Sequence, residues 1–306
     1  MRDAVTAARA RGVAIAVRVT WEPGDARRFV AEALLGDATA MIAVGGDGTV
    51  GEVAGALADA GKTARKVSLG IVPLGTANDF ATAAGIPQMP SEAFDLIAAT
   101  DPRPIDLLRI TTAEETRWCA NMLSGGFGPQ VTGQTSDGLK RALGSFAYAI
   151  TAMAKIGRID SIEMTARGEG FEWTGRALAI GIGNGQLSGG GHALCRDARI
   201  DDGRLDLTLV PELGESLGET LDTWLLKGGG AALDNVALRL QFDSLEIEAP
   251  EPLTMHVDGE PMVSRRFHID CCARRVRMHL PPDSPMLSHR QPGARGIAGV
   301  HSAASS

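Results

Sequence analysis

The chain of 306 residues has few of the features by which several classes of protein are recognised. Aromatic residues make up 4% of it, with a single tyrosine, and its four cysteines include no CxxC pair. The six histidines show no HExxH or other metal-ligating spacing. These absences argue against disulfide pairing and against a zinc motif, and they predict the reduced thiols of a cytosolic protein.

A long hydrophobic run and a surplus of positive charge are also absent. The first twelve residues contain no hydrophobic stretch like that of a signal peptide. The longest apolar stretch, 143–156, is shorter than the roughly 20 residues that span a bilayer. The net charge of -7 argues against a broad nucleic-acid surface. We therefore predict a cytoplasmic globular protein that binds no nucleic acid.

The N-terminal third of the chain alternates between strand and helix patterns. Short apolar or β-branched runs predict strands at 13–20, 39–46 and 66–75. Apolar spacing and flanking glycines predict helices at 24–36, 49–61 and 76–85. Such alternation is typical of a doubly wound α/β domain, in which helices cover both faces of a parallel sheet.

The pattern changes near residue 104, at TDPRPID (100–106). Beyond it the chain is β-rich, interrupted mainly by helical patterns at 137–156 and 215–228. The sequence predicts a first domain over 1–104 and a mostly antiparallel β domain over 105–287. The Gly-, Ala- and Ser-rich residues 288–306 are expected to be a disordered tail. Helix 137–156 is expected to pack in a core, with docking on a membrane surface as the alternative.

A glycine-rich turn, GGDGT at 45–49, lies between a predicted strand and a predicted helix. Glycine lets the backbone approach a ligand closely, and free N–H groups at a helix start attract an anion. Thr49 and Glu52 have the spacing of a capping box, so a tight capped turn explains the motif equally well. Asp47 fits either a role in ordering the loop or a contact with Mg²⁺ or a ribose. The turn alone leaves these alternatives open.

A second turn of the same kind, PLGTANDF at 73–80, follows the next predicted strand. Gly75 is followed by Thr76 and Asp79, which repeat the spacing of a capping pair. The carboxyl ends of neighbouring parallel strands meet at one edge of a sheet, and ligands bind there in such folds. Two glycine-and-threonine turns at one edge therefore favour a nucleotide site.

GGDGTVGEV and PLGTANDFA together resemble the diacylglycerol kinase catalytic domain, which bacterial lipid kinases share with sphingosine and ceramide kinases. Within that family, the sequence resembles the YegS-type bacterial lipid kinases in particular. The further motifs that carry this likeness are RVTWEPGDA (18–26), NMLSGGFG (121–128), GIGNGQLSGGGHALC (181–195), IDDGRLDL (200–207), VDGEP (257–261) and LPPDSP (280–285). The resemblance implies a doubly wound nucleotide domain, a β-rich lipid-binding domain and an active site in the cleft between them.

The resemblance also implies roles for particular residues. Glu260 of VDGEP takes the place of the catalytic base, although Asp258-Gly259 is equally a hairpin signal that would make Glu260 an ordinary turn residue. Thr20 is expected at the edge of the sheet that carries the two turns, because it ends the predicted strand 13–20. The residues expected to contact ATP are Thr20, Gly46, Asp47, Gly48, Thr49, Val50, Gly51, Glu52 and Thr76.

A metal site is implied as well, in the segment 199–204. Asp202 would supply a carboxylate, and Arg199 and Arg204 only their carbonyl oxygens, although DDG is also turn chemistry. Oxygen ligands suit Mg²⁺ or Ca²⁺. ATP is the implied co-substrate and a membrane lipid the acceptor, which would bring the protein to the inner membrane surface. The SGGG run at 188–191 fits a gate, a backbone approach to lipid or a plain loop.

Two departures from the family pattern bear on activity. The family has one more strand before its first helix, whereas Met1 lies inside that helix, so domain 1–104 is expected to lack a strand and to expose an apolar edge. Gly51 stands where Asn is usual.

Three functions remain open. The first is an ATP-dependent lipid kinase acting on a glycerolipid such as phosphatidylglycerol or diacylglycerol. NAD kinases also carry GGDGT, and an inactive nucleotide- or lipid-binding module is the third. VDGEP together with PLGTANDFA favours the lipid kinase.

Overall fold

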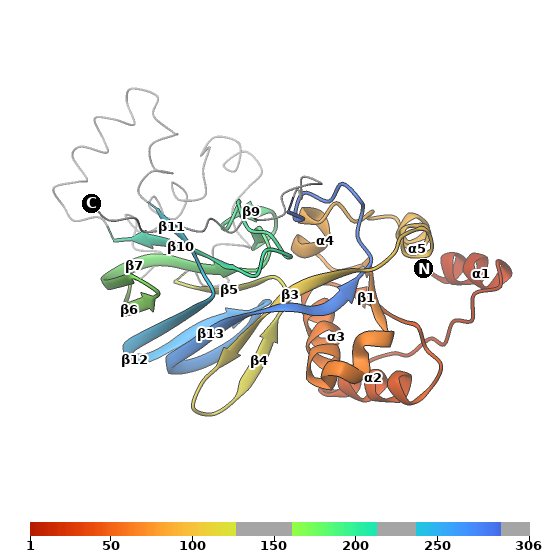
Figure 1. The fold of residues 1–306 in the computed structure, drawn as a ribbon, viewed down its shortest axis with the longest axis horizontal. Coiled ribbons are helices and arrows are strands. Elements are labelled where there is room, and N and C mark those ends of the chain that lie inside the picture. Colours follow the sequence, from red (N-terminus) through yellow and green to blue (C-terminus); the bar gives the residue numbers. More distant parts are fainter. Residues whose placement is uncertain (127–160, 213–236, 289–306) are drawn as a thin grey trace, which may run out of the picture.

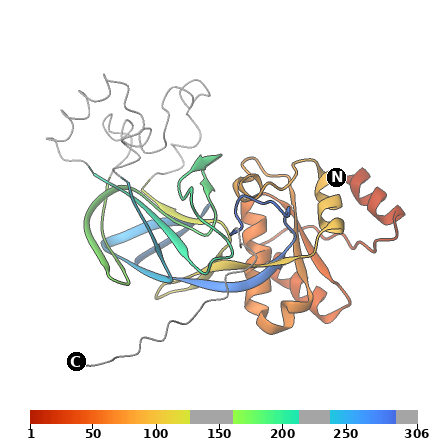
Figure 2. The same ribbon diagram turned by 45° about the horizontal axis from the view of Figure 1, so that its top comes forward.

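The computed structural model describes residues 1–126, 161–212 and 237–288. These residues form two parts that lie side by side (Figures 1 and 2), a helix-rich part from the N-terminal third and a β-rich part from the remainder. The predicted fold class, a nucleotide-domain fold followed by an antiparallel β domain, is confirmed. The helices predicted at 137–156 and 215–228, and the predicted tail from residue 289 onwards, lie outside the described residues.

The first part is a small parallel sheet with helices on both faces (Figure 1). Strands β1 (Ala40–Gly45) and β2 (Ser68–Pro73) pair in parallel. Ile71 packs on the side of α2 and α3, whereas Val72 packs on the side of α1 and α5. This alternation is the period of a strand buried on both faces. The helical elements are α1 (Arg2–Ala10), α2 (Asp25–Leu35), α3 (Asp47–Ala60), the 3₁₀ turn η1 (Gly61–Lys66), α4 (Asp79–Ala83) and α5 (Pro90–Ala99).

Residues 13–20, predicted to be a strand, form none in the structure. A strand needs a neighbour to satisfy its backbone groups. Within the described chain these residues pair with no strand, and β1 pairs only with β2. Val19 is 71% exposed, and Trp21 just after the segment is 92% exposed. The prediction was wrong because β-branched composition is a tendency that only a pairing partner turns into a strand.

The second part consists of antiparallel strands around an apolar core in which Leu123, Ile180 and Phe267 are fully buried. The order is β1-β2-β13-β12-β5-β7-β10-β11, with β3, β4 and β6 attached beside this path and β8–β9 forming a separate ribbon. The bounds are β3 (Arg103–Thr111), β4 (Thr116–Cys119), β5 (Met122–Gly125), β6 (Ile162–Gly168), β7 (Phe171–Gly183), β8 (Leu187–Ser188), β9 (His192–Ala193), β10 (Leu205–Pro211), β11 (Leu238–Phe242), β12 (Ser244–Val257) and β13 (Glu260–Met278).

Strand β13 joins the two parts. It pairs antiparallel with β12 and β3, and its last residue, Met278, lies beside Leu69 of β2 in a parallel pairing. Its register with β3 shifts at a bulge around Arg274, where φ is 55°. The buried Asp106 carboxylate holds this bulge, because Oδ1 accepts the Arg274 N–H at 2.7 Å. One continuous strand thus carries the β domain into the first part.

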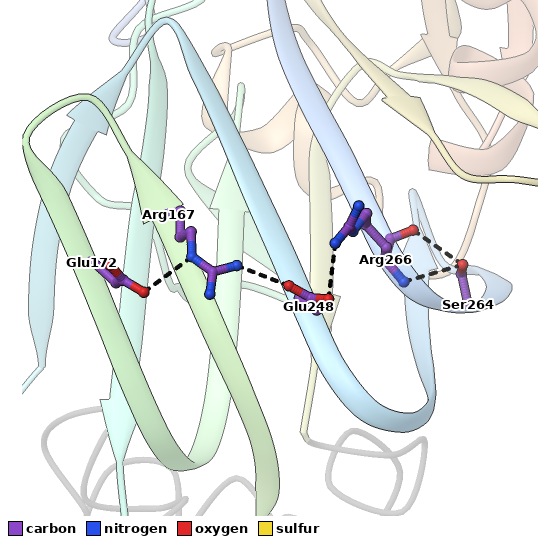
Figure 3. A network of polar contacts seen from close by, with 5 residues as sticks. All are labelled: Arg167, Glu172, Glu248, Ser264 and Arg266. Atoms are coloured by element: carbon purple, nitrogen blue, oxygen red, sulfur yellow. Dashed lines mark hydrogen bonds and ion pairs between the residues drawn. The ribbon is translucent and has the colours of Figure 1, made fainter.

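Charged side chains link four neighbouring strands on an exposed face of the β domain (Figure 3). Arg167 lies 3.0 Å from Glu172 and 2.8 Å from Glu248. Glu248 also contacts Arg266 at 2.9 Å, and the backbone of Arg266 is tied to the Ser264 hydroxyl. Exposed ion pairs contribute little stability each, but complementary charges on adjacent strands favour this register over a shifted one.

Among the described helices, none combines the length and apolar character required to cross a membrane.

A buried histidine fastens the end of β13 to the first part. Nδ1 of His279 lies 2.9 Å from the Thr100 carbonyl oxygen, and Nε2 lies 2.9 Å from the Ser68 Oγ. A carbonyl can only accept, so Nδ1 carries the proton and Nε2 accepts from the serine hydroxyl. Burial lowers the pKa of His279 from its ordinary value, which keeps the ring neutral.

This histidine makes stability depend on pH. The pKa of His279 is lower in the folded chain than in the unfolded chain. Below about pH 6.5 the unfolded chain therefore binds more protons than the folded chain, and the free energy of unfolding falls. This fall ends once the pH has passed below the pKa of the folded chain. We expect His279→Asn to lose that part of the pH dependence. Urea unfolding of both proteins between pH 7.5 and 5 measures it, and identical pH profiles would contradict the prediction.

Candidate active site

The two glycine-rich turns meet at the carboxyl ends of β1 and β2. A Cβ atom on Gly75 would lie 2.4 Å from the Cα of Gly46, so the two turns are in backbone contact. The Leu74 N–H donates to the Gly45 carbonyl at 2.9 Å, which carries the strand pairing on into the turns. The predicted meeting of both turns at one sheet edge is confirmed, and the contact leaves no room for a side chain.

Neither predicted capping pair forms. Helix α3 begins at Asp47 with Gly46 as N-cap, so Thr49 lies inside the first turn, and no side chain in the described part of the chain caps the helix. Helix α4 begins only at Asp79, after Asn78 with φ 53°. The first prediction was wrong because α3 begins two residues before Thr49, and the second because α4 takes its cap from the other turn, which spacing within one motif cannot show. The first N–H groups of α3 are left open to an anion.

Asp47 supplies that distant cap. Its two carboxylate oxygens accept the N–H groups of Asp79 and Phe80, both at 2.9 Å. An anion at a helix N-terminus satisfies unpaired donors and is favoured by the helix dipole. Of the roles that the sequence left open for Asp47, the structure therefore shows the first, in which its carboxylate orders the loop.

Asp79 then connects the first part to the SGGG run of the β domain. Its carboxylate accepts the N–H of Gly190 at 2.9 Å and that of Gly191 at 2.7 Å. Both glycines have positive φ values, 85° and 97°, which other residues adopt only under strain. Burial raises the pKa of Asp79, and these two N–H groups oppose the rise. The run is thus a loop held by a contact between the two parts.

A hairpin brings the candidate base to this region. Strands β12 and β13 are joined at Asp258 and Gly259, whose φ values of 48° and 95° suit a type I′ turn. The Asp258 carboxylate accepts three N–H groups, of Ala120, Asn121 and Met122, at 2.8, 2.9 and 3.0 Å. Burial raises its pKa, and these bonds oppose the rise. The hairpin is therefore fastened to the corner after β4.

The same carboxylate touches helix α3. A Cβ on Gly51 would lie 2.6 Å from Asp258 Oδ2, so a residue without a side chain lets the helix pack against the hairpin. Glu260 follows two residues later and is exposed. Its carboxylate forms no hydrogen bond or ion pair with any described residue, which leaves it free to accept a proton from a ligand.

The segment 199–204 is held in place by one aspartate outside it and one within it. Asp106 accepts the Gly203 N–H at 2.7 Å through Oδ2. Asp201 accepts both the N–H and the hydroxyl of Ser288 at 2.7 Å. The guanidinium of Arg199 donates to the Pro285 carbonyl at 2.8 Å, and that of Arg204 lies 3.1 Å from Asp243. Both arginine side chains are occupied elsewhere. The metal site expected from the sequence uses only the main-chain carbonyl oxygens of these two residues, so it does not need their side chains.

The donor set of this segment fits a hard cation. No group of three or more His, Cys, Asp or Glu side chains in the described ranges could hold a metal, so a metal here depends on main-chain oxygens. Asp202 Oδ1 accepts the Arg204 N–H at 2.9 Å, a turn contact, whereas Oδ2 meets no described residue but Gln241, at 3.5 Å, so one carboxylate oxygen is available. Desolvation raises the pKa of Asp202. Desolvation, together with the negative charge of Asp202, raises the pKa of Asp206 to about 6. A cation would relieve this accumulation of negative charge.

Comparison with known proteins agrees with this geometry. The diacylglycerol kinase catalytic domain model matches residues 1–110, and the YegS C-terminal NAD kinase beta sandwich-like domain model matches residues 121–278. A probable lipid kinase YegS-like from Xanthomonas euvesicatoria is 52% identical, covering 94% of this chain and 93% of the relative. One from Pseudomonas aeruginosa is 45% identical over 94% and 91%. A solved diacylglycerol kinase structure from Bacillus anthracis shares the fold, with a TM-score of 0.63 and 22% identity over 86% of this chain and 84% of that one.

Identity of this level over nearly the whole chain decides the family. The chain belongs to the YegS-like lipid kinase family. It is therefore a kinase, and both the resemblance and the fold inferred from the sequence are confirmed.

The residues expected to contact ATP in this kinase have different surroundings in the structure. Thr20 ends the irregular segment 13–20, so the predicted strand that would have placed it at the sheet edge is absent from the described chain. Val50 is buried in the core and its N–H is used within α3. Gly48 lies open: outside its own helix turn, no atom of the described residues lies within 4 Å of the place where a Cβ would be. Glu52 and Thr76 are exposed.

Three aspartates that organise the site carried no assigned role. Asp106 is the one acidic residue in the largely apolar run PIDLLRI, and Asp258 follows a strand and precedes glycine. Both features are signals in retrospect. Asp79 had only the spacing of a local cap. All three bind main-chain N–H groups that are distant in sequence, which no local pattern displays.

The contact between the turns can be tested with a glycine pair. Gly75→Ala should destabilise the kinase by about 1–3 kcal/mol, because the added methyl group meets backbone that cannot move aside. Gly48→Ala adds the same group in open space within a helix, where alanine is favoured, and should cause no loss. Urea unfolding compares the two, and equal stabilities would contradict the contact.

The loop contact predicts an effect of Asp79→Asn. An amide provides one acceptor oxygen for two N–H groups, so the variant should lose about 1–3 kcal/mol of stability and exchange the Gly190 and Gly191 amide hydrogens faster. Asp95→Asn, in an exposed ion pair with Arg11, is the matched control and should change little. Equal effects of the two variants would contradict the role of Asp79.

Proposed function

We propose that this kinase transfers the γ-phosphate of ATP to a hydroxyl group of a glycerolipid, such as phosphatidylglycerol or diacylglycerol, with Glu260 as general base. The observation that carries the proposal is the contact of Gly51 with Asp258. It packs the hairpin that bears Glu260 against the helix that starts at the GGDGT turn. The phosphate-binding turn and the base would therefore face each other across the junction of the two parts.

The first turn of α3 supports the nucleotide half of the proposal. Its N–H groups receive no side-chain cap from any residue that the structure describes, and an anionic phosphate would satisfy them. The negative charge of Asp47, which would repel a phosphate, is already bound to the start of α4. Gly46, Gly48 and Thr49 would approach the phosphates, with Thr76 exposed on the adjoining turn.

The free carboxylate of Glu260 supports the acceptor half. A lipid hydroxyl is a weak nucleophile at neutral pH, and its proton must be accepted as its oxygen attacks the γ-phosphorus. Glu260 would take that proton, while the bond from the γ-phosphorus to the bridging oxygen breaks and ADP leaves. Much of the rate would come from holding the two reactants in line.

A divalent cation fits the proposal at the segment 199–204. Asp202 and the carbonyl oxygens of Arg199 and Arg204 would hold Mg²⁺ or Ca²⁺. When bound, such a cation supplies positive charge that offsets the carboxylates of Asp202 and Asp206 and fastens the segment that Asp106 also holds.

The acceptor is proposed from two considerations. The curated relatives are named lipid kinases, and the solved neighbour is named a diacylglycerol kinase. A protein that phosphorylates membrane lipid would make peripheral contact with a membrane surface. NAD remains the acceptor to test against lipid, because the matched β-domain family is itself described as NAD kinase beta sandwich-like.

A labelled-phosphate assay tests the function. Purified protein with ATP and Mg²⁺ should phosphorylate phosphatidylglycerol or diacylglycerol in mixed micelles and should leave soluble NAD unmodified. Labelling of NAD alone, or of no acceptor in the panel, would overturn the proposed reaction.

The same assay tests the base. Glu260→Gln keeps the shape of the side chain but cannot accept the proton, so turnover should fall about 10²- to 10⁴-fold with ATP affinity unchanged. Glu251→Gln, on the exposed part of β12, is the matched control. Turnover of Glu260→Gln close to that of the control would remove Glu260 from its proposed role.

A further inference from the structure

Helix α3 is docked along one side onto the β domain. Gly51, Gly55 and Asp59 are spaced by four residues and therefore lie on one side of the helix. We refer to these three residues as the α3 stripe. Gly51 lies against Asp258, and a Cβ on Gly55 would lie 3.2 Å from the Cβ of Trp118. The Asp59 Oδ1 accepts the indole N–H of Trp118 at 2.7 Å.

Trp118 is held from its other side as well. The guanidinium carbon of Arg275 lies 5.0 Å from the centre of its ring, within the range of a cation–π contact. Arg275 also donates to the carbonyl oxygen of Ala58, near the end of α3. The indole is thus fixed between α3 and β13, with its N–H directed at Asp59.

The chain runs directly from this tryptophan to the hairpin of Glu260. Cys119 follows Trp118, and its thiol donates to Asp258 at 3.1 Å, together with the three N–H groups that come next. Just before Trp118, Arg117 donates to the Pro261 carbonyl at 3.0 Å. Residues 117–122, which we term the splint, therefore contact the chain on both sides of Glu260 and the distal half of α3.

Two separated contacts fix a helix where one would not. Along α3, Gly51 and Asp59 are about 12 Å apart at 1.5 Å per residue. Beyond Gly51, the far half of the helix is held by the packing of Gly55 on Trp118, by Arg275 at Ala58 and by the bond from Trp118 to Asp59. That last bond is directional and runs to the splint that also holds Asp258, so its loss would loosen the helix relative to the hairpin.

We propose that Trp118 and Asp59 are positioning residues for phosphoryl transfer, which set the distance between the GGDGT turn and Glu260 through helix α3. The inference rests on the proposed function, in which Glu260 accepts the proton. Neither residue touches substrate. They act by keeping the base and the phosphate site in register, on which the rate of an in-line transfer depends steeply.

Four variants test this role by steady-state kinetics. Trp118→Phe keeps a ring on Gly55 but loses the indole N–H, and Asp59→Ala loses the acceptor, so each should lower kcat at least about threefold with the KM for ATP unchanged. Asp59→Asn retains an oxygen for the indole and should restore most of the kcat. Arg27→Ala removes only the exposed ion pair to Asp59 and should match wild type.

The double variant measures whether the two residues act as one. Trp118→Phe with Asp59→Ala should be no slower than the slower single variant, because both remove the same bond. Hydrogen exchange gives a reading that does not depend on catalysis, and the amides of 119–122 and of the end of α3 should exchange faster in both single variants. Additive losses, or exchange as in wild type, would overturn the proposal.

A purely structural role predicts a lower unfolding midpoint with unchanged kcat per folded molecule, and that result would also overturn the proposal. Should Trp118→Phe fail to fold, the comparison of Asp59→Ala with Asp59→Asn carries the test. Glu260→Gln leaves the α3 stripe intact. The turnover of Glu260→Gln therefore tests the assignment of Glu260 as the base, independently of the positioning role of Trp118 and Asp59.

Discussion

The hydrogen bond from a main-chain N–H group to a shielded aspartate carboxylate is the interaction on which this kinase depends. Asp47, Asp79, Asp106 and Asp258 each accept two or more such bonds, and in each case at least one partner is distant in the sequence. A desolvated carboxylate without partners would be costly, and burial raises the pKa of Asp79, Asp106 and Asp258. Each carboxylate therefore requires its loop to stay in place, and each loop depends on its carboxylate.

These four carboxylates are arranged as a chain of contacts through the site. Asp47 fixes the start of α4, and Asp79 at that start fixes the SGGG loop of the β domain. Asp258 fixes the hairpin to the corner after β4, and Gly51 brings α3 against it. The glycines and the carboxylates serve one purpose, since close backbone approach is what lets a short aspartate side chain reach two segments at once.

The first part of the chain was largely predictable, because its signals are local. Helix 24–36 and the strands at 39–46 and 66–75 occur within a few residues of their predicted bounds, since apolar spacing and flanking glycine act over one element. Residues 13–20 carry the same local signal and form no strand, because pairing is a property of two segments. The capping pair at Thr76 and Asp79 failed for the same reason, because the cap of α4 comes from Asp47, 32 residues away.

By itself the sequence determined the family and the residue types on offer: two glycine turns after predicted strands, a glutamate in VDGEP, and the Asp-rich segment 200–202. Only the tertiary structure decided which groups meet. It joined Asp47 to α4, Asp79 to the SGGG loop, and Asp59 to Trp118. The physical reason is that residue type and spacing set what one segment can do, whereas these contacts need two folded segments brought within hydrogen-bond distance by the packing of both parts.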